Sequence, residues 1–475
     1  HGGAAMRPPR RGTSRPPLKS GRRLPGPVAA RPRPAAEGVG VPVAGGTRIT
    51  GLVIDHLSVL LAQVLRFDGP ADAVMSRFFK QNTRLGGRER SLIAEATFDA
   101  LRRLASLRWM LQPAAPERAP RLAALVPLAR QHGLAALAPG VLRGDERAVR
   151  HALLLDLATA PGAVRGELPF WLFARITAQY HDAEPLLACM TGPAPLDLRV
   201  NGMKAERDAV LAQLQASARE HAPLAAAATR YSPEGIRLHD KPPLTRWPLY
   251  QQGLVEVQDE GSQLIARLVA PRRGELVVDF CAGAGGKTLA LGSLMRSTGR
   301  LYAFDVHAKR LAGLGPRLKR SGLSNVHPAA IAHENDLRVK RLAGKVDRVL
   351  VDAPCSGSGT LRRNPDLKWR FDEAELARVN EVQGRVLRAA ARLLKPGGRL
   401  VYATCSLLAL ENQEVIDRFL AEQPQFAAVD AAGVLAAQGI VIDHAARFVP
   451  YFVMLPHLHG TDGFFAAVLE RRAST

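Results

Sequence analysis

The C-terminal half of the sequence predicts an α/β fold built on a doubly wound parallel sheet. From residue 261 onward, short apolar runs rich in β-branched residues alternate with stretches of helical periodicity, as in strands covered on both faces by helices. A glycine-rich turn follows the first run, and a cysteine follows both the fourth and the fifth. The expected strands cover residues 276–280, 300–304, 326–331, 346–351, 399–403 and 464–469.

The longest helix of this part is expected between the fourth and fifth strands. Asp372 is a suitable N-cap residue, and Glu375 follows three positions later, which is the signature of a capping box. The helix is expected to end before Pro396-Gly397-Gly398, because these residues do not continue a helix.

Three segments precede the α/β domain. The first alternates Arg, Pro and Gly and predicts a disordered basic tail. The second predicts an all-helical domain, because apolar residues such as Leu57, Leu61 and Val64 recur at helical spacing. The third predicts a small α+β module with a strand at Leu196–Val200 and a helix over 206–218. The expected divisions of the chain are 1–48, 49–160, 161–260 and 261–475.

The chain is strongly basic, with a formal net charge of +22 over 475 residues. Sustained positive charge favours a polyanionic partner, most simply RNA or DNA, because each neutralised phosphate releases condensed counterions. Arg greatly outnumbers Lys in a chain rich in Ala, which a GC-rich coding bias also produces. Charge alone therefore leaves both explanations open.

The composition also limits the location and class of the protein. No apolar stretch approaches the roughly 18 residues that a membrane helix needs, and the N-terminus lacks the apolar core of a signal peptide. We therefore expect a cytoplasmic protein. The four cysteines are far apart with no CxxC pair, which argues against a disulfide scaffold and a zinc module, so no metal is expected.

The glycine-rich turn after the first strand predicts a small-ligand site. A P-loop is incomplete, because Cys281 occupies its first glycine position, and a dinucleotide fingerprint fails, because Thr288 replaces its third glycine. S-adenosylmethionine remains, with Asp305 expected on the ribose hydroxyls and Asp336 on the adenine amino group. A solvated loop acid is the other interpretation of Asp336. The turn comprises Cys281, Ala282, Gly283, Ala284, Gly285, Gly286 and Lys287.

The fourth strand leads into Asp352-Ala353-Pro354-Cys355, where enzymes of this fold that methylate exocyclic amines carry an aromatic residue. A thiol in that place suggests covalent chemistry, which an unreactive ring carbon needs. Carbon 5 of a pyrimidine is such an atom, since it becomes nucleophilic only after a thiolate adds to carbon 6. One of Cys355 and Cys405 would attack and the other would assist release, while Asp352 would hold the base.

Both cysteines precede expected helix or turn N-termini, a setting that lowers the pKa of a thiol. The alternative interpretation is that both are merely small buried hydrophobic residues. The residues alone leave open which thiol attacks.

These segments resemble the RNA 5-methylcytosine methyltransferases of the Sun/Fmu (RsmB-like) family over most of the chain. The resemblance implies a Rossmann-like class I methyltransferase domain, a NusB-like RNA-binding domain in the helical segment, and small-subunit ribosomal RNA as the substrate. The segments that carry it are residues 258–262, 281–288, 305, 352–356, 362–369, 404–406 and 460–465.

The resemblance also implies residue roles. Cys405 attacks carbon 6, Cys355 promotes release, and Asp352 contacts both the base and the cofactor. The glycine-rich turn with Asp305 and Asp336 holds S-adenosylmethionine. One departure is Ala-Gly-Ala-Gly-Gly-Lys-Thr, where the family more often has Ala-Pro-Gly-Gly-Lys-Thr. The basic residues after the Cys355 loop are candidate RNA contacts, with an exposed basic loop as the alternative: Arg362, Arg363, Lys368 and Arg370.

We therefore expect a monomeric enzyme that transfers a methyl group from S-adenosylmethionine to carbon 5 of a cytosine in RNA. Two alternatives stay open. A uracil-5 RNA methyltransferase would use the same addition to carbon 6, and a ribosome assembly factor would bind RNA without catalysis.

Overall fold

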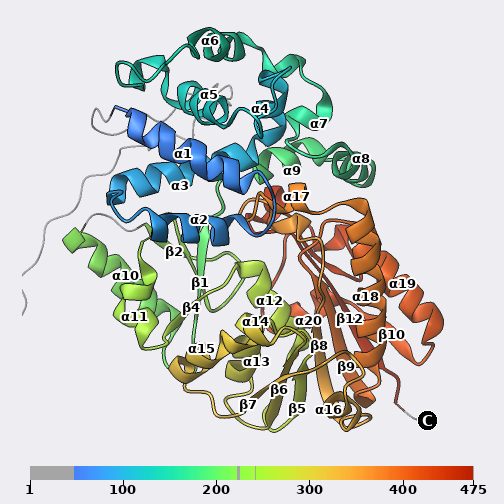
Figure 1. Cartoon of the computed structure of the whole chain (residues 1–475). Helices are drawn as coiled ribbons and strands as arrows, with labels where there is room; N and C mark the ends of the chain where they lie inside the picture. The colour runs from blue at the N-terminus through green and yellow to red at the C-terminus, as the bar shows by residue number, and fades with distance from the viewer. Residues whose placement is uncertain (1–47, 222–224, 241, 474–475) are drawn as a thin grey trace, which may run out of the picture. The chain divides into compact units, whose positions relative to one another are not determined.

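Helices, a small antiparallel sheet and a large mixed sheet follow one another along the chain (Figure 1). The computed structural model describes residues 48–221, 225–240 and 242–473, all within one compact unit. The tail expected over residues 1–48 lies outside the described residues, apart from Arg48. No helix in the described ranges is long and apolar enough to cross a membrane.

The first part is helical, as its apolar spacing predicts. The first helix begins after Thr50, whose hydroxyl accepts a hydrogen bond from the Val53 amide at 3.4 Å. Its buried Leu57, Leu61 and Val64 belong to a core shared with the following helices. These are α1 (Gly51–Val64), α2 (Ala71–Gln81), α3 (Gly87–Arg102), α4 (Leu104–Met110), α5 (Pro120–His132) and α6 (Glu146–Leu154).

Helices continue beyond residue 160, where the mixed module was expected to begin. Leu172 and Ile176 pack in one cluster with residues of the C-terminal part such as Leu407. The Tyr180 hydroxyl also donates to the Leu407 carbonyl at 2.8 Å. Helices α8 (Phe170–Gln179) and α9 (Ala183–Met190) therefore pack against the C-terminal part of the chain. The short helix α7 (Gly162–Arg165) precedes them.

The small sheet has the strand order β2-β3-β1-β4, with every pairing antiparallel. The strand and the helix expected in this segment are confirmed as β1 (Leu196–Val200) and α10 (Arg207–His221). The turn before the third strand closes through a hydrogen bond from the Gly235 amide to the Ser232 carbonyl at 3.1 Å. The other strands are β2 (Ala226–Ala228), β3 (Gly235–Leu238) and β4 (Val255–Val257).

The large sheet has the order β10-β12-β9-β8-β5-β6-β7, with β11 paired to β12. The five strands from β7 to β9 are parallel, as expected, but β12 runs antiparallel to β9. The sheet is therefore mixed, because an antiparallel group covers one edge of a parallel sheet. Its strands are β5 (Leu276–Asp279), β6 (Arg300–Asp305), β7 (Val326–Ala330), β8 (Val346–Asp352), β9 (Leu394–Thr404), β10 (Phe426–Val429), β11 (Phe452–Met454) and β12 (Phe464–Arg471).

Helices cover both faces of this sheet (Figure 1). Val277 and Val278 are neighbours in β5, yet they lie in two different core clusters because successive strand residues point to opposite faces. One face packs against α12 (Glu260–Val269), α13 (Gly286–Leu294) and α20 (Ala431–Ala436), the other against α18 (Glu373–Ala391) and α19 (Gln413–Glu422).

The expected cap of α18 is confirmed, since the Asp372 carboxylate accepts a hydrogen bond from the Glu375 amide at 2.7 Å. The shorter helices are α11 (Pro248–Gln251), α14 (Ala308–Ala312), α15 (Leu314–Ser321), α16 (Leu337–Lys340), α17 (Leu367–Arg370) and α21 (Pro456–His459).

Candidate active site

The two cysteines meet at the carboxyl ends of β8 and β9. These parallel strands end side by side, with Asp352 paired to Ala403 in the ladder. Cys355 and Cys405 follow within a few residues, and their Sγ atoms lie 3.3 Å apart. The two thiols therefore lie side by side, and their roles in one catalytic site stay a prediction. A thiol pair at the carboxyl edge of an open α/β sheet lies where such folds bind their ligands.

The Cys355 thiol is not acidified by its position. Its contact with Cys405 raises the pKa of Cys355 well above the ordinary value, and burial raises it further. A hydrogen bond from the Gly357 amide acts in the opposite direction but has a smaller effect. Burial likewise raises the pKa of Cys281. The expectation of a lowered thiol pKa is therefore wrong for Cys355, because the second thiol and burial outweigh the backbone amide.

Lys287 connects the glycine-rich turn to the cysteine site. Its Nζ donates to Oδ2 of Asp352 at 2.8 Å, and the Lys287 side chain is largely buried. Burial acts to lower the pKa of Lys287, but the Asp352 carboxylate and Cys405 reverse the effect, so the pKa is raised. A fixed ammonium therefore lies close enough to Cys405 for an electrostatic interaction between the two groups.

The glycine-rich turn is held against Asp305 at the end of β6. The Gly283 amide donates to Oδ2 of Asp305 at 2.7 Å, and the His307 amide donates to Oδ1 at 2.7 Å. Gly285 has a φ of +84° and lies just before α13, a conformation that favours glycine. Each Asp305 oxygen keeps a second acceptor site, so the carboxylate is able to take both hydroxyls of a ribose.

Asp336 is the N-cap residue of α16. Its Oδ2 accepts from the Ala332 amide at 3.0 Å and its Oδ1 from the Arg338 amide at 2.9 Å. These backbone hydrogen bonds lower the pKa of Asp336 and give it a local structural role. Its expected contact with adenine stays a prediction.

Two apolar side chains near these acids were not predicted from the sequence as site residues. Val306 follows Asp305 and is 51% exposed, and Leu337 follows Asp336 and is 69% exposed. The two segments are neighbours, since the Ile331 amide donates to the Asp305 carbonyl at 3.0 Å. Exposed apolar residues beside a polar cradle suit the faces of an aromatic base. The signal available in the sequence was one apolar residue directly after each acid.

Two of the expected RNA contacts lie in an internal ion-pair cluster. Arg362 is nearly fully buried and donates to Asp462 at 3.2 Å. Arg363 donates to the same carboxylate at 2.6 Å and to Asp259 at 3.0 Å. Burial, together with the Asp462 charge, raises the pKa of Asp259 to about 7. These arginines tie together three of the segments that carry the family resemblance, and the geometry lends no support to their contacting RNA.

The other two expected RNA contacts also have internal partners. Lys368 is buried and donates from Nζ to the Arg102 carbonyl of α3 at 2.8 Å, and burial lowers its pKa to about 7. Arg370 pairs with Asp366 at 3.2 Å and remains partly exposed. A role of these four residues in RNA binding stays a prediction.

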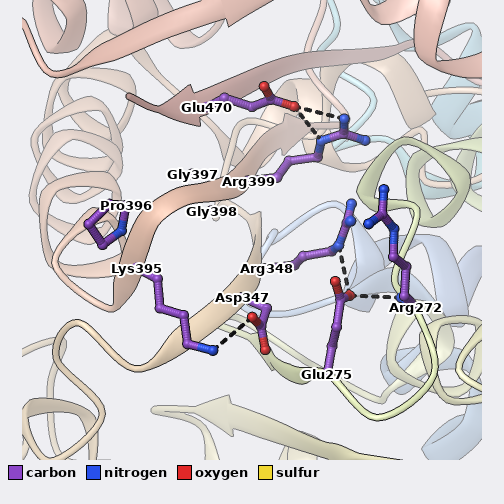
Figure 2. A pocket seen from close by; sticks show the side chains of 10 residues that line it. All are labelled: Arg272, Glu275, Asp347, Arg348, Lys395, Pro396, Gly397, Gly398, Arg399 and Glu470. Carbon is purple, nitrogen blue, oxygen red and sulfur yellow. Dashed lines mark hydrogen bonds and ion pairs between the residues drawn. The ribbon is translucent and has the colours of Figure 1, made fainter. Parts of the chain in front are cut away.

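A separate hollow lies at the amino ends of β5 and β8, away from the cysteines (Figure 2). It has a volume of about 240 Å³, and six of the charged side chains that line it form three ion pairs. The pairs are Arg348 with Glu275 at 2.8 Å, Lys395 with Asp347 at 3.0 Å, and Arg399 with Glu470 at 2.8 Å. Because these charges are satisfied within the protein, the hollow is a poor candidate for the active site.

A doubly wound domain with a glycine-rich turn after its first strand and an acid after its second is a Rossmann-like domain of the kind that binds nucleotide cofactors. Residues 266–470 match the family model described as 16S rRNA methyltransferase RsmB/F. Residues 168–245 match the ferredoxin-like domain of RsmF/B-like methyltransferases. The expected domain limits at residues 160 and 260 differ from these matches and stay expectations.

Several curated relatives are similar over most of the chain. A probable ribosomal RNA small subunit methyltransferase B of Synechocystis is 35% identical over 359 residues, covering 73% of this chain and 77% of the relative. A second probable ribosomal RNA small subunit methyltransferase B, from Bacillus subtilis, is 32% identical over 351 residues, covering 72% of this chain and 74% of the relative. The chain therefore belongs to the RsmB/F family of rRNA methyltransferases.

Solved structures agree with this fold. The protein PH0851 superposes with a TM-score of 0.74 at 24% identity, covering 89% of this chain and 99% of that one. A methyltransferase homolog from Pyrococcus horikoshii superposes with a TM-score of 0.55 at 28% identity, covering 67% of this chain and 100% of the homolog. The predicted family and fold class are thus confirmed, while the roles of individual site residues stay predictions.

Proposed function

We propose that this protein transfers a methyl group from S-adenosylmethionine to carbon 5 of a cytosine in small-subunit ribosomal RNA, through a covalent adduct at carbon 6. The observation that carries the proposal is the 3.3 Å contact between Cys355 and Cys405 beside the Lys287 and Asp352 ion pair. The names of the relatives support the substrate class. A cytoplasmic location and a monomeric state remain predictions.

The residues around the glycine-rich turn fit the cofactor. Asp305 has acceptor sites left for the ribose hydroxyls, and Val306 and Leu337 are exposed where the faces of adenine need apolar contact. Gly283 and Gly285 both have positive φ, a backbone conformation that favours glycine, and the Gly283 amide holds the turn against Asp305. When bound, the cofactor supplies the electrophilic methyl group.

The surroundings of the two thiols support Cys405 as the nucleophile. The Lys287 ammonium interacts with Cys405, whereas Cys355 has a raised pKa and faces an anion, Glu411. We therefore assign the attack to Cys405, the thiol that interacts with the ammonium. Attack forms the bond between Cys405 Sγ and carbon 6, and the ring electrons displaced to carbon 5 take the methyl group.

Release requires the loss of the proton on carbon 5. We infer that Cys355, which lies in contact with the attacking sulfur, first loses its own proton to solvent and then, as a thiolate, accepts the proton of carbon 5. The electrons of that C–H bond restore the ring double bond and expel Cys405 as a thiolate. A thiol with a raised pKa forms a strong base once it is ionised. The lifetime of the adduct should therefore fall as the pH rises.

The hydrogen-bonding capacity of Asp352 favours cytosine over uracil as the substrate base. Its Oδ2 pairs with Lys287, and its side chain remains about one-third exposed, which leaves Oδ1 to accept a hydrogen bond from the exocyclic amine of cytosine. Uracil has a carbonyl oxygen at that position, and two acceptors would repel each other. A uracil-5 specificity would therefore need a different partner for the base.

The test uses labelled S-adenosylmethionine, total RNA and three variants, followed by mapping of the modified base. Cys405→Ala should form no adduct, and Cys355→Ala should accumulate a covalent protein and RNA species. Cys189→Ala is the control, because Cys189 is exposed on α9. The reverse pattern would exchange the two roles, and methylation that survives both active-site changes would refute covalent catalysis. Failure of the wild type to bind the cofactor would favour a non-catalytic assembly factor.

A further inference from the structure

A fully buried carboxylate lies behind the two cysteines and takes no direct part in the mechanism above. Glu411 is in the short helical turn η5 (Ala409–Glu411), between β9 and α19, and its exposure is 0%. A buried carboxylate is costly unless donors surround it. Its hydrogen-bond partners therefore indicate which parts of the protein it organises.

Glu411 joins the residues that follow the two cysteines. Its Oε1 accepts from the Ser356 amide at 2.7 Å, and its Oε2 accepts from the Ser356 hydroxyl at 2.6 Å and from the Ser406 hydroxyl. Gln383 of α18 donates to Oε1 at 3.1 Å and also to the Pro354 carbonyl at 2.8 Å. One carboxylate thus binds the loop after β8 to the loop after β9.

We propose that Glu411 is a positioning residue that holds these two loops so that the thiols of Cys355 and Cys405 stay in contact. Each serine directly follows its cysteine in the chain, so a shift of either serine moves the neighbouring thiol. The importance of this contact for catalysis rests on the covalent function proposed above. The contact itself is testable without RNA or cofactor.

The charge of Glu411 adds to the effect of its position. After the contact with Cys405 and burial, the Glu411 carboxylate is a further cause of the raised pKa of Cys355. The Lys287 ammonium acts on the other thiol, Cys405. The Glu411 carboxylate therefore acts on Cys355 and the Lys287 ammonium acts on Cys405, so two side chains of the same type have different electrostatic surroundings.

Disulfide trapping measures the thiol contact directly. Diamide removes two electrons and two protons from a thiol pair and is reduced to a hydrazine as the S–S bond forms. The observed 3.3 Å needs a closure of only about 1.3 Å to reach a disulfide length. Peptide mapping of the full chain then gives the rate at which the bond between Cys355 and Cys405 forms.

The variants separate position from charge. Glu411→Ala removes the four hydrogen bonds of the carboxylate and leaves direct ones between the loops, such as that from the Gly359 amide to the Cys405 carbonyl at 2.9 Å. Trapping should slow by about tenfold, because the effective concentration of one thiol at the other falls. Glu411→Gln keeps an acceptor of the same reach and should restore most of the rate. Glu411→Asp, one methylene shorter, should trap slowly. Glu414→Ala is the matched control, because Glu414 is exposed in the first turn of α19.

The same variants should also differ in how much covalent adduct they accumulate and how much methylated product they release. Glu411→Ala should accumulate adduct as Cys355→Ala does, and Glu411→Gln should recover release. Thermal unfolding verifies that each variant is folded, and if Glu411→Ala is not, Glu411→Asp carries the test. Trapping at the wild-type rate in a folded Glu411→Ala or Glu411→Asp would overturn the proposal. Trapping that follows the expected order without any methylation would instead reject the proposed function alone.

Discussion

Replacing Asp279 by asparagine should change how the stability of the protein depends on pH. Asp279 ends β5 and is 1% exposed. The Thr288 hydroxyl donates to its Oδ2 at 2.6 Å, while Oδ1 has no hydrogen-bond partner among the described residues. Burial raises the pKa of Asp279 to about 7, since the bond from Thr288 offsets only part of the desolvation. Near pH 8 the folded chain therefore buries a poorly compensated charge.

The magnitude follows from the difference between the ordinary pKa of 3.8 and the folded value of about 7. That difference corresponds to about 4 kcal/mol at 1.36 kcal/mol per pH unit. The folded state binds the proton more tightly than the unfolded state, so the protonated group stabilises the fold fully below pH 3.8. This stabilisation is lost as the pH rises to about 7. Between pH 5 and pH 8 the loss is about 3 kcal/mol.

The assay compares the urea unfolding of wild type and Asp279→Asn at pH 5 and pH 8, without cofactor. The buried amide N–H₂ of the variant costs about 1–3 kcal/mol where it lacks a partner, but this cost is the same at both pH values. The variant should therefore gain about 3 kcal/mol relative to wild type at pH 8 compared with pH 5.

Asp347→Asn is the control for this experiment. Burial acts to raise the pKa of Asp347, but the Leu276 amide and Lys395 outweigh it, so the pKa is lowered. The carboxylate is ionised at both test conditions, and its replacement should destabilise the protein equally at pH 5 and pH 8. An equal difference between Asp279→Asn and wild type at the two pH values would refute the reasoning.

Three further changes test the site and its support. Gly285→Ala places a Cβ against the Leu314 side chain at positive φ, which costs about 1–2 kcal/mol of strain. Cofactor affinity measured by calorimetry should therefore fall about tenfold. Gly315→Ala is the control and should leave the affinity unchanged, because its Cβ meets no atom within 4 Å. Lys287→Met should slow adduct formation by about 100-fold with little change in RNA affinity; an unchanged rate would contradict an electrostatic role. Trp369→Ala loses a 3.1 Å hydrogen bond to α3 and its packing there, so the unfolding free energy in urea should fall by about 2–3 kcal/mol, and an unchanged midpoint would contradict this.

The sequence predicted the parallel strands well, because buried parallel strands are nearly continuous apolar runs. β5, β6, β7 and β8 begin at the expected residues and end within one residue of the expected positions. The direction of β12 escaped prediction, because hydrophobic periodicity is the same for parallel and antiparallel strands. The start of β9 at Leu394 was also missed, since Pro396 and two glycines argue against a strand.

Local motifs predicted the parts of the site but not their connections. The glycine-rich turn and the cysteines were visible because each follows a strand within a few residues. The pair of Lys287 with Asp352 spans 65 positions, and no local pattern indicates it. Arg363 was a candidate RNA contact because it is one of the basic residues after the Cys355 loop. Its partners Asp259 and Asp462 lie 104 and 99 positions away, so no local pattern indicates them. Two residues of a basic run in the sequence, Arg362 and Arg363, thus belong to an internal ion-pair cluster in the fold.

Glu411 shows why a candidate site stays incomplete at the sequence level. In the sequence it is one acid among polar neighbours after an apolar segment, and such residues are usually exposed. Only the folding of η5 behind the ends of β8 and β9 removes it from water. Since four donor groups then converge on this carboxylate, the geometry of the thiol pair depends on a residue that carries no chemical motif. In the proposed mechanism the two cysteines supply the reactivity, and the buried carboxylate together with Lys287 makes their surroundings unequal.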